Sequence, residues 1–343
     1  EWYADQSALQ EALDLPAAEL THQDAYRPLD YLPADVQAAI LNDCLVVLGT
    51  EFGLDLALLY EDTSSSYFEG DQCAWAQHGY SRDRRPDRPQ VNYDVGVLPG
   101  GFPARLGVYA GQVPDNRVID QVSDAWAHQH PTTRTVLVLD RGMTLLRNRR
   151  RLIGNGQGFV AGLKIVGATR TLVLAIPNAA FTEDVPLPED KEPLQVVRRA
   201  STIRVRGEQV PVMNHIFFNP AQAARDRAAR ERRIAAARVA VAAVQAQVDA
   251  GQLQQPAVIR RRAKQKLKQH KVHAFFVVKF DTQQRQIILQ PRADKLAERA
   301  LLDGKFVLQT TEVAWSAAQV LTTYRGHDEA EKVIQRLKQV IPC

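Results

Sequence analysis

The sequence predicts an α/β fold, in which a mixed sheet flanked by helices is interrupted by a large inserted β-containing domain with a long basic helix. Apolar runs of strand length alternate with helical patterns between residues 56 and 164. A long Ala- and Arg-rich stretch follows Asn219 and separates two groups of strand-like segments. Two acidic residues that the pattern places in one core, Asp140 and Glu331, are much further apart in the chain than one strand–helix step requires. A separate domain is therefore expected between them.

The first part of the core is expected over residues 56–164, after an acidic helical segment at residues 1–55. Hydrophobic periodicity and Pro/Gly punctuation predict a mostly helical stretch over residues 5–58, a helix over 116–128, and strands over 56–68, 91–98, 105–110, 135–139 and 158–163. The sequence Pro99-Gly100-Gly101 is typical of a hairpin turn between two of these strands. Asp62 then lies on the first strand, and Asp140 follows the fourth.

The inserted domain is expected over residues 165–304, and the last part of the core over residues 305–343. Short strands are predicted at 172–176, 203–206, 212–218, 274–280, 286–289 and 306–310, and mostly helix at 316–340. Asn219 and Pro220 are typical of an N-cap and a first helical position. They predict one helix that ends near Gly251 and is roughly 45 Å long at about 1.5 Å per residue.

Composition limits the class of protein. With 343 residues, of which 45% are hydrophobic, the chain can bury about two cores. The three cysteines form no Cys-x-x-Cys pair, which argues against a disulfide framework or a zinc knuckle. No apolar run is long enough for a membrane span, and no signal peptide is recognisable, so we expect a soluble cytoplasmic protein. Residue 1 is Glu, and we expect the chain to derive from a longer one.

Charge is distributed unevenly along the chain. Residues 1–72 contain 15 acidic residues and one basic residue, a net charge of −14, whereas the remainder has 42 basic and 24 acidic residues, a net charge of +18. A basic body of this kind favours a polyanionic partner, and nucleic acid is the first candidate. A solvated charged surface is the alternative interpretation.

Three acids are candidate metal ligands: Asp62, Asp140 and Glu331. Three carboxylates around one point repel each other unless divalent cations neutralise them. Mg²⁺ prefers oxygen ligands and accepts phosphate oxygens, and two such ions about 3.5–4 Å apart support phosphodiester chemistry. Taken singly, the three acids could instead be a strand-end turn residue, a loop cap and a member of a helix capping box. Glu61 is expected to face the opposite side of its strand.

Several blocks of sequence resemble bacterial insertion-sequence transposases of the DDE type, which have an RNase H-like catalytic core. The blocks around Asp62 (residues 60–69) and Asp140 (residues 138–143) resemble the first-acid and second-acid blocks, and residues 79–91 and 108–116 resemble segments between them. The last block is similar to the signature Tyr-x2-Arg-x3-Glu-x6-Lys of the branch with a β-rich inserted domain. Tyr324, Glu331 and Lys338 match that signature, whereas His327 stands where the family has Arg.

The resemblance implies a catalytic and metal-binding triad of Asp62, Asp140 and Glu331 in an RNase H-like core. It also implies Mg²⁺ as cofactor, with Mn²⁺ as an alternative, and double-stranded transposon ends and target DNA as partners of a homodimer. The function implied is Mg²⁺-dependent cleavage at transposon ends and strand transfer into target DNA. Two alternatives stay open: a truncated, catalytically silent transposase remnant that only binds DNA, and a metal-dependent DNA nuclease without strand transfer.

Candidate DNA contacts fall in two places. The spacing of Tyr324, His327, Glu331 and Lys338 predicts one shared face of a single helix, where the other three flank DNA beside the acid. The second place is a dense basic run, for which we expect phosphate contact by Arg260, Arg261, Arg262, Lys264 and Lys268. Two further basic clusters, at residues 147–151 and 225–238, fit a DNA contact or a solvated helix face.

Overall fold

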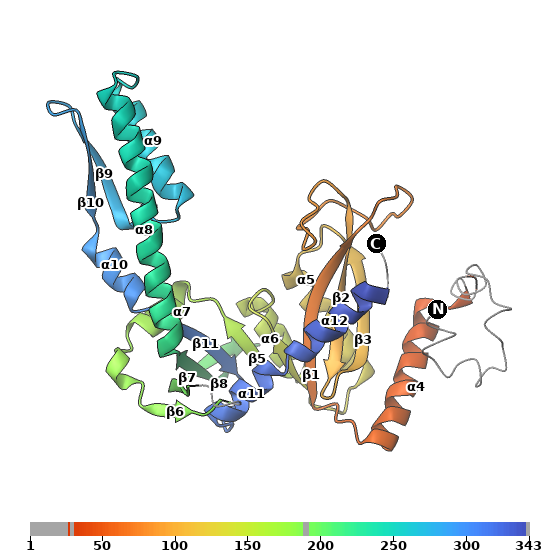
Figure 1. Ribbon diagram of the computed structural model, residues 1–343. Helices are drawn as coiled ribbons and strands as arrows, with labels where there is room; N and C mark the ends of the chain where they lie inside the picture. The colour runs from red at the N-terminus through yellow and green to blue at the C-terminus, as the bar shows by residue number, and fades with distance from the viewer. Residues whose placement is uncertain (1–26, 28–30, 188–191, 341–343) are drawn as a thin grey trace.

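The computed structural model describes residue 27, residues 31–187 and residues 192–340 of the chain (Figure 1). Its strands are β1 (Leu58–Tyr67), β2 (Gln90–Leu98), β3 (Phe102–Ala110), β4 (Val136–Leu139), β5 (Gly158–Leu163), β6 (Glu183–Val185), β7 (Leu194–Val205), β8 (Glu208–Phe218), β9 (Phe276–Asp281), β10 (Gln286–Pro291) and β11 (Lys305–Thr310). Its α-helices are α4 (Ala34–Phe52), α5 (Asp115–Gln129), α6 (Leu146–Gly154), α7 (Gly167–Leu174), α8 (Pro220–Asp249), α9 (Pro256–Gln269), α10 (Ala293–Ala300), α11 (Ala317–Arg325) and α12 (Asp328–Val340). Two short 3₁₀ helices are η3 (Asn178–Ala180) and η4 (His273–Phe275).

Nine of the described strands form one mixed sheet in the order β3-β2-β1-β4-β5-β11-β8-β7-β6, and β9 pairs with β10 in a separate hairpin. β1, β4 and β5 run parallel to one another, whereas β1–β2 and β2–β3 are antiparallel pairs. A mixed sheet flanked by helices is therefore confirmed as the fold class. The strands expected in residues 56–164 and the hairpin turn at Gly100 and Gly101 are also confirmed.

Helices cover both faces of this sheet, which explains why β4 and β5 are continuous apolar runs that are buried along their whole length. On one face, α5 and α6 pack against the sheet, and Trp126 of α5 lies in the same apolar cluster as Leu137 of β4. On the other face, α11 and α12 cover the sheet, and Ile334 of α12 shares a cluster with Val138. Neighbouring residues of β4 thus point to opposite faces, as the pleat of a strand requires.

The sheet continues beyond β5 through strands from the region expected to be an inserted domain. β11 lies between β5 and β8, and β7 and β6 follow β8. β6, β7 and β8 therefore extend the main sheet, and a separate domain over residues 165–304 is not confirmed. The chain leaves the sheet only after Phe218 of β8 and returns at Lys305 of β11, two residues that pair directly with each other.

Residues 219–304, called the arm from here on, project from the sheet (Figure 1). The long helix α8 begins as predicted, because the Asn219 side chain accepts a hydrogen bond of 2.9 Å from the backbone N–H of Gln222 and Pro220 occupies the first helical position. The arm has apolar clusters of its own. They join α8 to α9 and to the β9–β10 hairpin, with Val241, Leu267 and Phe276 among the buried side chains.

The structure differs from the predicted local structure in three places. Residues 172–176, predicted as a strand, lie mostly in helix α7, since a short apolar run does not distinguish a buried strand from a buried helix. α6 and α9 were not predicted, although α9 contains the dense basic run. Residues 316–340 are mostly helical, as predicted, but they form two helices, α11 and α12, which meet at Gly326 and His327, so Tyr324 and Glu331 do not share one helical face.

Two expectations concern regions that the structure describes only in part. Residues 1–26 and 28–30 of the acidic N-terminal segment lie outside the described residues, and α4 accounts for the helical part that follows. Cys44 and Cys73 are free thiols, and Cys343 lies outside the described residues. Among the residues described, no helix combines the length and the apolar character needed to cross a bilayer.

Candidate active site at the ends of two parallel strands

Asp62 and Asp140 lie side by side at one end of the sheet. The register of the parallel pair β1–β4 places Glu61 opposite Leu139, so the next residue of each strand is one of the two acids. β4 ends at Leu139, whereas β1 continues to Tyr67 with only β2 as its neighbour. The two carboxylates therefore meet where the sheet narrows, and we call this pair the strand-end site.

The electrostatics of the pair follow from its half-buried position. Burial raises the pKa of Asp62, and the nearby charge of Asp140 raises it further, while His327, the Thr63 backbone N–H and Arg82 act in the opposite direction. The Thr63 N–H donates a hydrogen bond of 2.8 Å to Asp62. Asp140 is exposed. A carboxylate whose ionisation is disfavoured by a second carboxylate beside it favours a cationic partner.

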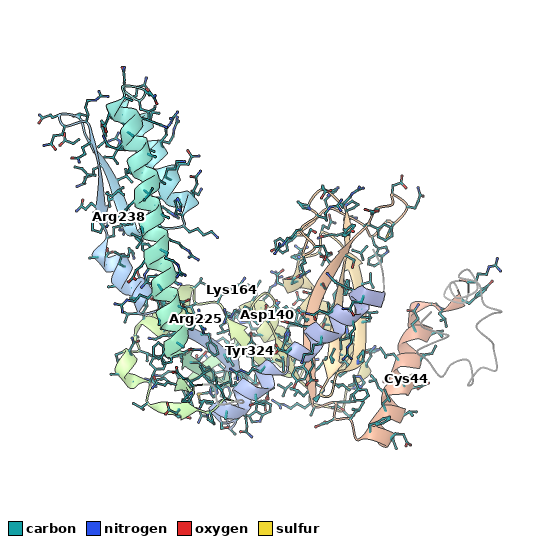
Figure 2. All side chains as sticks on the ribbon, in the orientation of Figure 1. Cys44, Asp140, Lys164, Arg225, Arg238 and Tyr324 are labelled. Carbon is teal, nitrogen blue, oxygen red and sulfur yellow. The ribbon has the colours of Figure 1, made fainter. Side chains whose placement is uncertain are left out.

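Tyr324 contacts the second acid from the end of α11. Its hydroxyl donates a hydrogen bond of 3.3 Å to Asp140 Oδ1, and Figure 2 places the two residues close together at the middle of the molecule. Burial raises the pKa of Tyr324 to about 12, with the charge of Asp140 as the next cause. The phenol therefore stays protonated at neutral pH and can orient the carboxylate.

Gly326 and His327 separate the two C-terminal helices, and this corrects the prediction of one shared helical face. A Cβ on Gly326 would lie 2.2 Å from the Tyr60 hydroxyl, so only glycine permits this close approach to β1. His327 is buried, and its Nε2 lies 2.9 Å from the backbone oxygen of Glu61. His327 thus fastens the start of α12 to β1, and its expected contact with DNA stays a prediction.

Helix α12 runs alongside β1 from its start to its end. At the start, His327 contacts Glu61, and at the end Leu337 and Lys338 line the same cavity as Tyr67. Lys338 also forms an ion pair of 2.7 Å with Asp83 in the loop between β1 and β2. Glu331 lies between these two anchors, so α12 brings it to the side of β1 that Asp62 faces.

The third acid is nevertheless not in contact with the other two. Glu331 is exposed, and its side chain forms no hydrogen bond or ion pair with the residues that the structure describes. In the described part of the chain, no group of three or more His, Cys, Asp or Glu side chains could hold a metal ion. The three-acid metal site therefore stays a prediction, and Asp62 and Asp140 are the two of its acids that lie on adjacent strand ends.

The strand-end pair fits Mg²⁺ by its donor chemistry. Proteins commonly bind this ion through one or two carboxylates, with waters and substrate phosphates as the remaining ligands. Asp62 and Asp140 supply two carboxylates from adjacent strand ends, and the charge of Asp140 raises the pKa of Asp62. Two such oxygen donors without a lysine or arginine ion pair are what a hard divalent cation requires.

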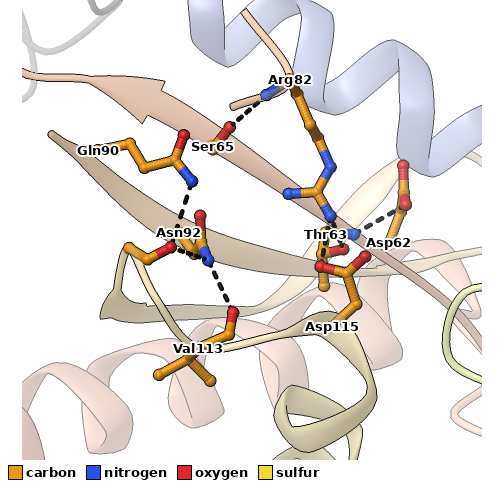
Figure 3. A network of polar contacts seen from close by, with 9 residues as sticks. Asp62, Thr63, Ser65, Arg82, Gln90, Asn92, Val113 and Asp115 are labelled. Atoms are coloured by element: carbon orange, nitrogen blue, oxygen red, sulfur yellow. Dashed lines mark hydrogen bonds and ion pairs between the residues drawn. The ribbon is translucent and has the colours of Figure 1, made fainter. Parts of the chain in front are cut away.

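Arg82 is a residue of the site that the sequence did not single out. Its guanidinium donates hydrogen bonds to Thr63 Oγ1 (2.8 Å) and to Asp115 Oδ1 (2.5 Å), and its backbone N–H donates to Ser65 (Figure 3). It thereby holds the loop before β2 against β1 and brings a positive charge close to Asp62. The only signal in the sequence was its place in the Arg-rich run at residues 81–88.

Glu61 faces away from the strand-end site, as predicted. It is fully buried with Asp94 on the other face of the sheet, where Arg105 forms ion pairs with both carboxylates. Burial and the neighbouring Asp94 raise the pKa of Glu61 well above its ordinary value. Burial alone would lower the pKa of Arg105, but the two carboxylates raise it, so the guanidinium keeps its charge.

The basic run of α9 lies far from the strand-end site, on the arm. The buried residues of this helix are Ile259, Ala263 and Leu267, and the opposite side is exposed. The exposed side contains the five predicted phosphate contacts, Arg260, Arg261, Arg262, Lys264 and Lys268. The whole arm has 18 Lys or Arg and 7 Asp or Glu, a net charge of +11.

Comparison with known proteins gives distant structural likeness alone. No protein-family model matches the chain. No curated protein matches it. Among solved structures, it is similar to a chain of the cryo-EM structure of a piggyBac transposase synaptic complex with hairpin DNA, at a TM-score of 0.40 and 8% identity. The likeness covers 84% of this chain and 41% of that one, so this chain spans less than half of its neighbour. At this TM-score it assigns neither a fold family nor an activity.

Proposed function

We propose that the protein is a DNA transposase of the bacterial insertion-sequence type, which cleaves DNA at transposon ends and joins them to target DNA with Mg²⁺. The observation that carries the proposal is the pair of carboxylates, Asp62 and Asp140, at neighbouring ends of the parallel strands β1 and β4. Phosphodiester cleavage needs oxygen ligands for divalent cations at a rigid point, and adjacent strand ends provide one.

Each residue of the site has a role in this proposal. Asp62 and Asp140 would hold Mg²⁺, which when bound supplies positive charge to the attacking and leaving oxygens at phosphorus. Tyr324 orients Asp140 through its hydrogen bond. Glu331 is the proposed third carboxylate, and its side chain is available because it has no partner among the described residues. Arg82 places a positive charge beside Asp62, where a phosphate would lie.

The shape of the molecule supports binding of a long polyanion. The arm and the far halves of β1 and β2 project from the same side of the molecule in the view of Figure 2, and Asp140 lies at the base between them. Arg225 and Arg238 mark two levels of α8 along the arm. Because the arm has a net charge of +11, it would attract the DNA backbone by release of condensed counterions.

Incubation of the protein with Mg²⁺ and a DNA duplex that contains transposon ends tests the proposal. Joined products support transposition. Nicks without joining support a metal-dependent nuclease. A salt-sensitive mobility shift with neither product supports a protein that only binds DNA. The same reactions with Mn²⁺ report whether the site accepts the softer ion, and light scattering of the DNA complex reports whether two copies act together.

Asp140→Asn is the sharpest test of the strand-end site. It keeps the size of the side chain and its hydrogen bond with Tyr324, but it removes a charge that a metal requires. We expect cleavage to fall by more than the roughly 10–100-fold that loss of an outer-shell partner costs, with DNA binding retained. Asp184→Asn, an exposed acid of β6, is the matched control and should cleave normally. Full cleavage by Asp140→Asn would show that the assignment of the strand-end site is wrong.

A catalytically silent DNA-binding protein is the second candidate. It is favoured by one observation: Glu331 does not join Asp62 and Asp140 in a group that could hold a metal ion. Absence of any metal-dependent product, together with intact DNA binding, would select this candidate.

A further inference from the structure

A second strongly basic surface lies where α6 meets the end of β7. A cavity of about 700 Å³ opens there, and we call it the arginine cavity. Five arginines and one acid line it: Arg147, Arg150, Arg151, Arg204, Arg206 and Asp124. This surface has no role in the function proposed above, although the sequence marks residues 147–151 as a basic cluster.

The charges of the arginine cavity are not balanced from within. Asp124 is already engaged, because it accepts hydrogen bonds from both Arg151 and Asn155. Of the other arginines, Arg147 donates to the backbone oxygen of Asn116, at 3.1 Å. The remaining three, Arg150, Arg204 and Arg206, form no hydrogen bond or ion pair with any described residue. Five positive charges against one negative charge leave a surplus of four.

Such a surplus points to a phosphate ligand. Like charges gathered in one cavity destabilise the fold unless an anion binds between them. The guanidinium group, with its planar fork of N–H donors, matches the oxygens of a phosphate in a two-point contact. The positive charge also affects a neighbouring residue, because burial and the charge of Arg150 lower the pKa of Arg149 to about 10.

The backbone of Arg206 gives an independent indication. Arg206 and Gly207 form the two-residue turn between β7 and β8, since Val205 pairs directly with Glu208. Arg206 has φ of 50°, a left-handed conformation that Asn, Asp or Gly would adopt at lower cost. Arginine at this turn position costs about 1 kcal/mol or more of backbone strain. The same residue lines the arginine cavity with its guanidinium.

The end of the arginine cavity formed by Arg204 and Arg206 lies far from the strand-end site, whereas Arg147 at its other end contacts Asn116, next to the Asp115 that binds Arg82. α6 packs on the face of the sheet opposite to the one that α11 and α12 cover. The strand pairings place Ala200 of β7 level with Val138 of β4. From this level β7 runs five residues to Val205, and β4 runs two residues to Asp140 in the opposite direction. At about 3.3 Å per residue, the separation along the strands alone is roughly 20 Å.

We propose that the arginine cavity binds the phosphate backbone of a DNA segment other than the segment held at the strand-end site. The Arg204 and Arg206 end of the cavity lies on the opposite face and toward the opposite end of the sheet from the strand-end site, so we assign it a DNA segment of its own. One molecule would then hold two DNA segments. The proposal rests on the proposed function only in taking DNA as the polyanion, and it does not require cleavage.

Two substitutions remove positive charge from the arginine cavity without destabilising the fold. Arg206→Asn puts the preferred residue into the left-handed turn position, and Arg204→Gln changes an exposed side chain without a partner. The double variant Arg204→Gln/Arg206→Asn should therefore fold at least as well as the parent. Arg134→Gln/Arg199→Gln is the control with the same loss of charge, because both side chains are exposed and lie outside the arginine cavity, the arm and the strand-end site.

A bridging assay separates the two DNA segments. Full-length protein with Asp140→Asn, which prevents cleavage, is bound to a biotinylated duplex on beads, and recruitment of a second, fluorescent duplex is measured against salt. We expect the cavity variant to bind the first duplex normally but to recruit roughly tenfold less of the second. Its salt slope for recruitment should fall by about 1.8, because each lost phosphate contact removes about 0.9. The control variant should recruit like the parent.

Two results would overturn the proposal. One is recruitment of the second duplex by the cavity variant at the level of the parent. The other is a cavity variant that loses binding of pyrophosphate while bridging is unchanged, which would assign the cavity to a small phosphate ligand. Failure of the proposed function is read separately, because a protein that never cleaves DNA still gives a bridging signal.

Discussion

Asp62 and Glu61 are neighbours in the chain, yet they experience opposite environments because successive residues of a strand face opposite sides of the sheet. Asp62 is half-buried beside Asp140 and close to Arg82 and His327. Glu61 is fully buried beside Asp94, and Arg105 is the cation that compensates both. The buried ion pairs of Arg105 with Glu61 and Asp94 therefore stabilise β1, the strand whose other face carries Asp62.

Arg105→Leu should destabilise the protein by about 3–5 kcal/mol, because it leaves two buried carboxylates without their cation. Denaturant unfolding at neutral pH measures the change. Arg88→Leu removes an arginine whose ion pair is exposed and should cost less than about 1 kcal/mol. Adding Asp94→Asn to Arg105→Leu should restore part of the lost stability, and a double variant no more stable than the single one would contradict this account.

His215 should make stability fall in mild acid. It is fully buried on β8, neither ring nitrogen has a hydrogen-bond partner, and burial together with Arg198 lowers its pKa to about 4. A lowered folded pKa means that the unfolded chain binds the proton first, so the contribution is complete above the unfolded pKa of about 6.5 and is lost as pH falls toward 4.

His215→Phe should flatten this dependence by roughly 2–3 kcal/mol between those two pH values, at about 1.4 kcal/mol for each unit of pKa. Phe also retains the stacking of the ring on Phe217. Denaturant unfolding at a series of pH values gives the profile. The control His128→Gln, at an exposed position of α5, should leave the profile unchanged, and equal slopes for parent and His215→Phe would refute the prediction.

At the scale of elements, most strands could be predicted because each is an apolar run bounded by turn residues. β4 was recognisable since a strand covered on both faces has no polar alternation. The run at residues 172–176 has the same composition but lies in α7, because length and neighbours, which sequence patterns resolve poorly, decide between helix and strand. α9 was missed for a related reason: its apolar side consists of only a few residues, and the dense basic run hides their helical spacing.

Some residues of the candidate site could also be predicted from the sequence, and others could not. Asp62 and Asp140 were predictable, since each belongs to a recognisable strand and parallel neighbours bring equivalent ends together. Glu331 was placed on a helix correctly, but the break at Gly326 was not predicted. That break depends on the contact of Gly326 with Tyr60, which is far away in the chain. Arg82 was missed because only the folded loop brings it to β1.

Asn219→Ala tests the element that supports the arm. The N-cap hydrogen bond to Gln222 satisfies one free N–H of the first turn of α8, and its loss should cost about 1 kcal/mol. Hydrogen exchange of the first-turn amides of α8 should accelerate more than exchange in β4. Asn178→Ala, at an exposed position of η3, is the control. Unchanged protection at the start of α8 would mean that packing alone holds the helix.

At the scale of the whole molecule, the arm is a replaceable part, because it joins two strands that already pair with each other. Replacing residues 219–304 by Asn-Gly would connect Phe218 to Lys305 with the two-residue turn that antiparallel strands prefer. We expect the shortened protein to keep its sheet, as judged by circular dichroism and cooperative melting. Its DNA affinity should fall on the order of 10²-fold or more in moderate salt, since the arm contributes a net charge of +11.

A shortened protein with full DNA affinity would place the DNA contacts elsewhere, on the arginine cavity or the loop before β2. The bridging assay then distinguishes these surfaces, because the arginine cavity does not depend on the arm. Loss of cooperative melting would instead mean that the arm stabilises the sheet, and the affinity measurement would no longer report on DNA contacts alone.

The late position of β11 in the chain has a consequence for synthesis. β11 fills the middle of the sheet between β5 and β8, but of the strands in the described residues it is the last to leave the ribosome. Until residue 310 has emerged, β5 and β8 each present an unpaired edge, and such edges promote association between nascent chains. The contacts of the arm are mostly local, so the arm can fold during this interval. It can then separate the edge of β5 from the edge of β8 until β11 pairs with both.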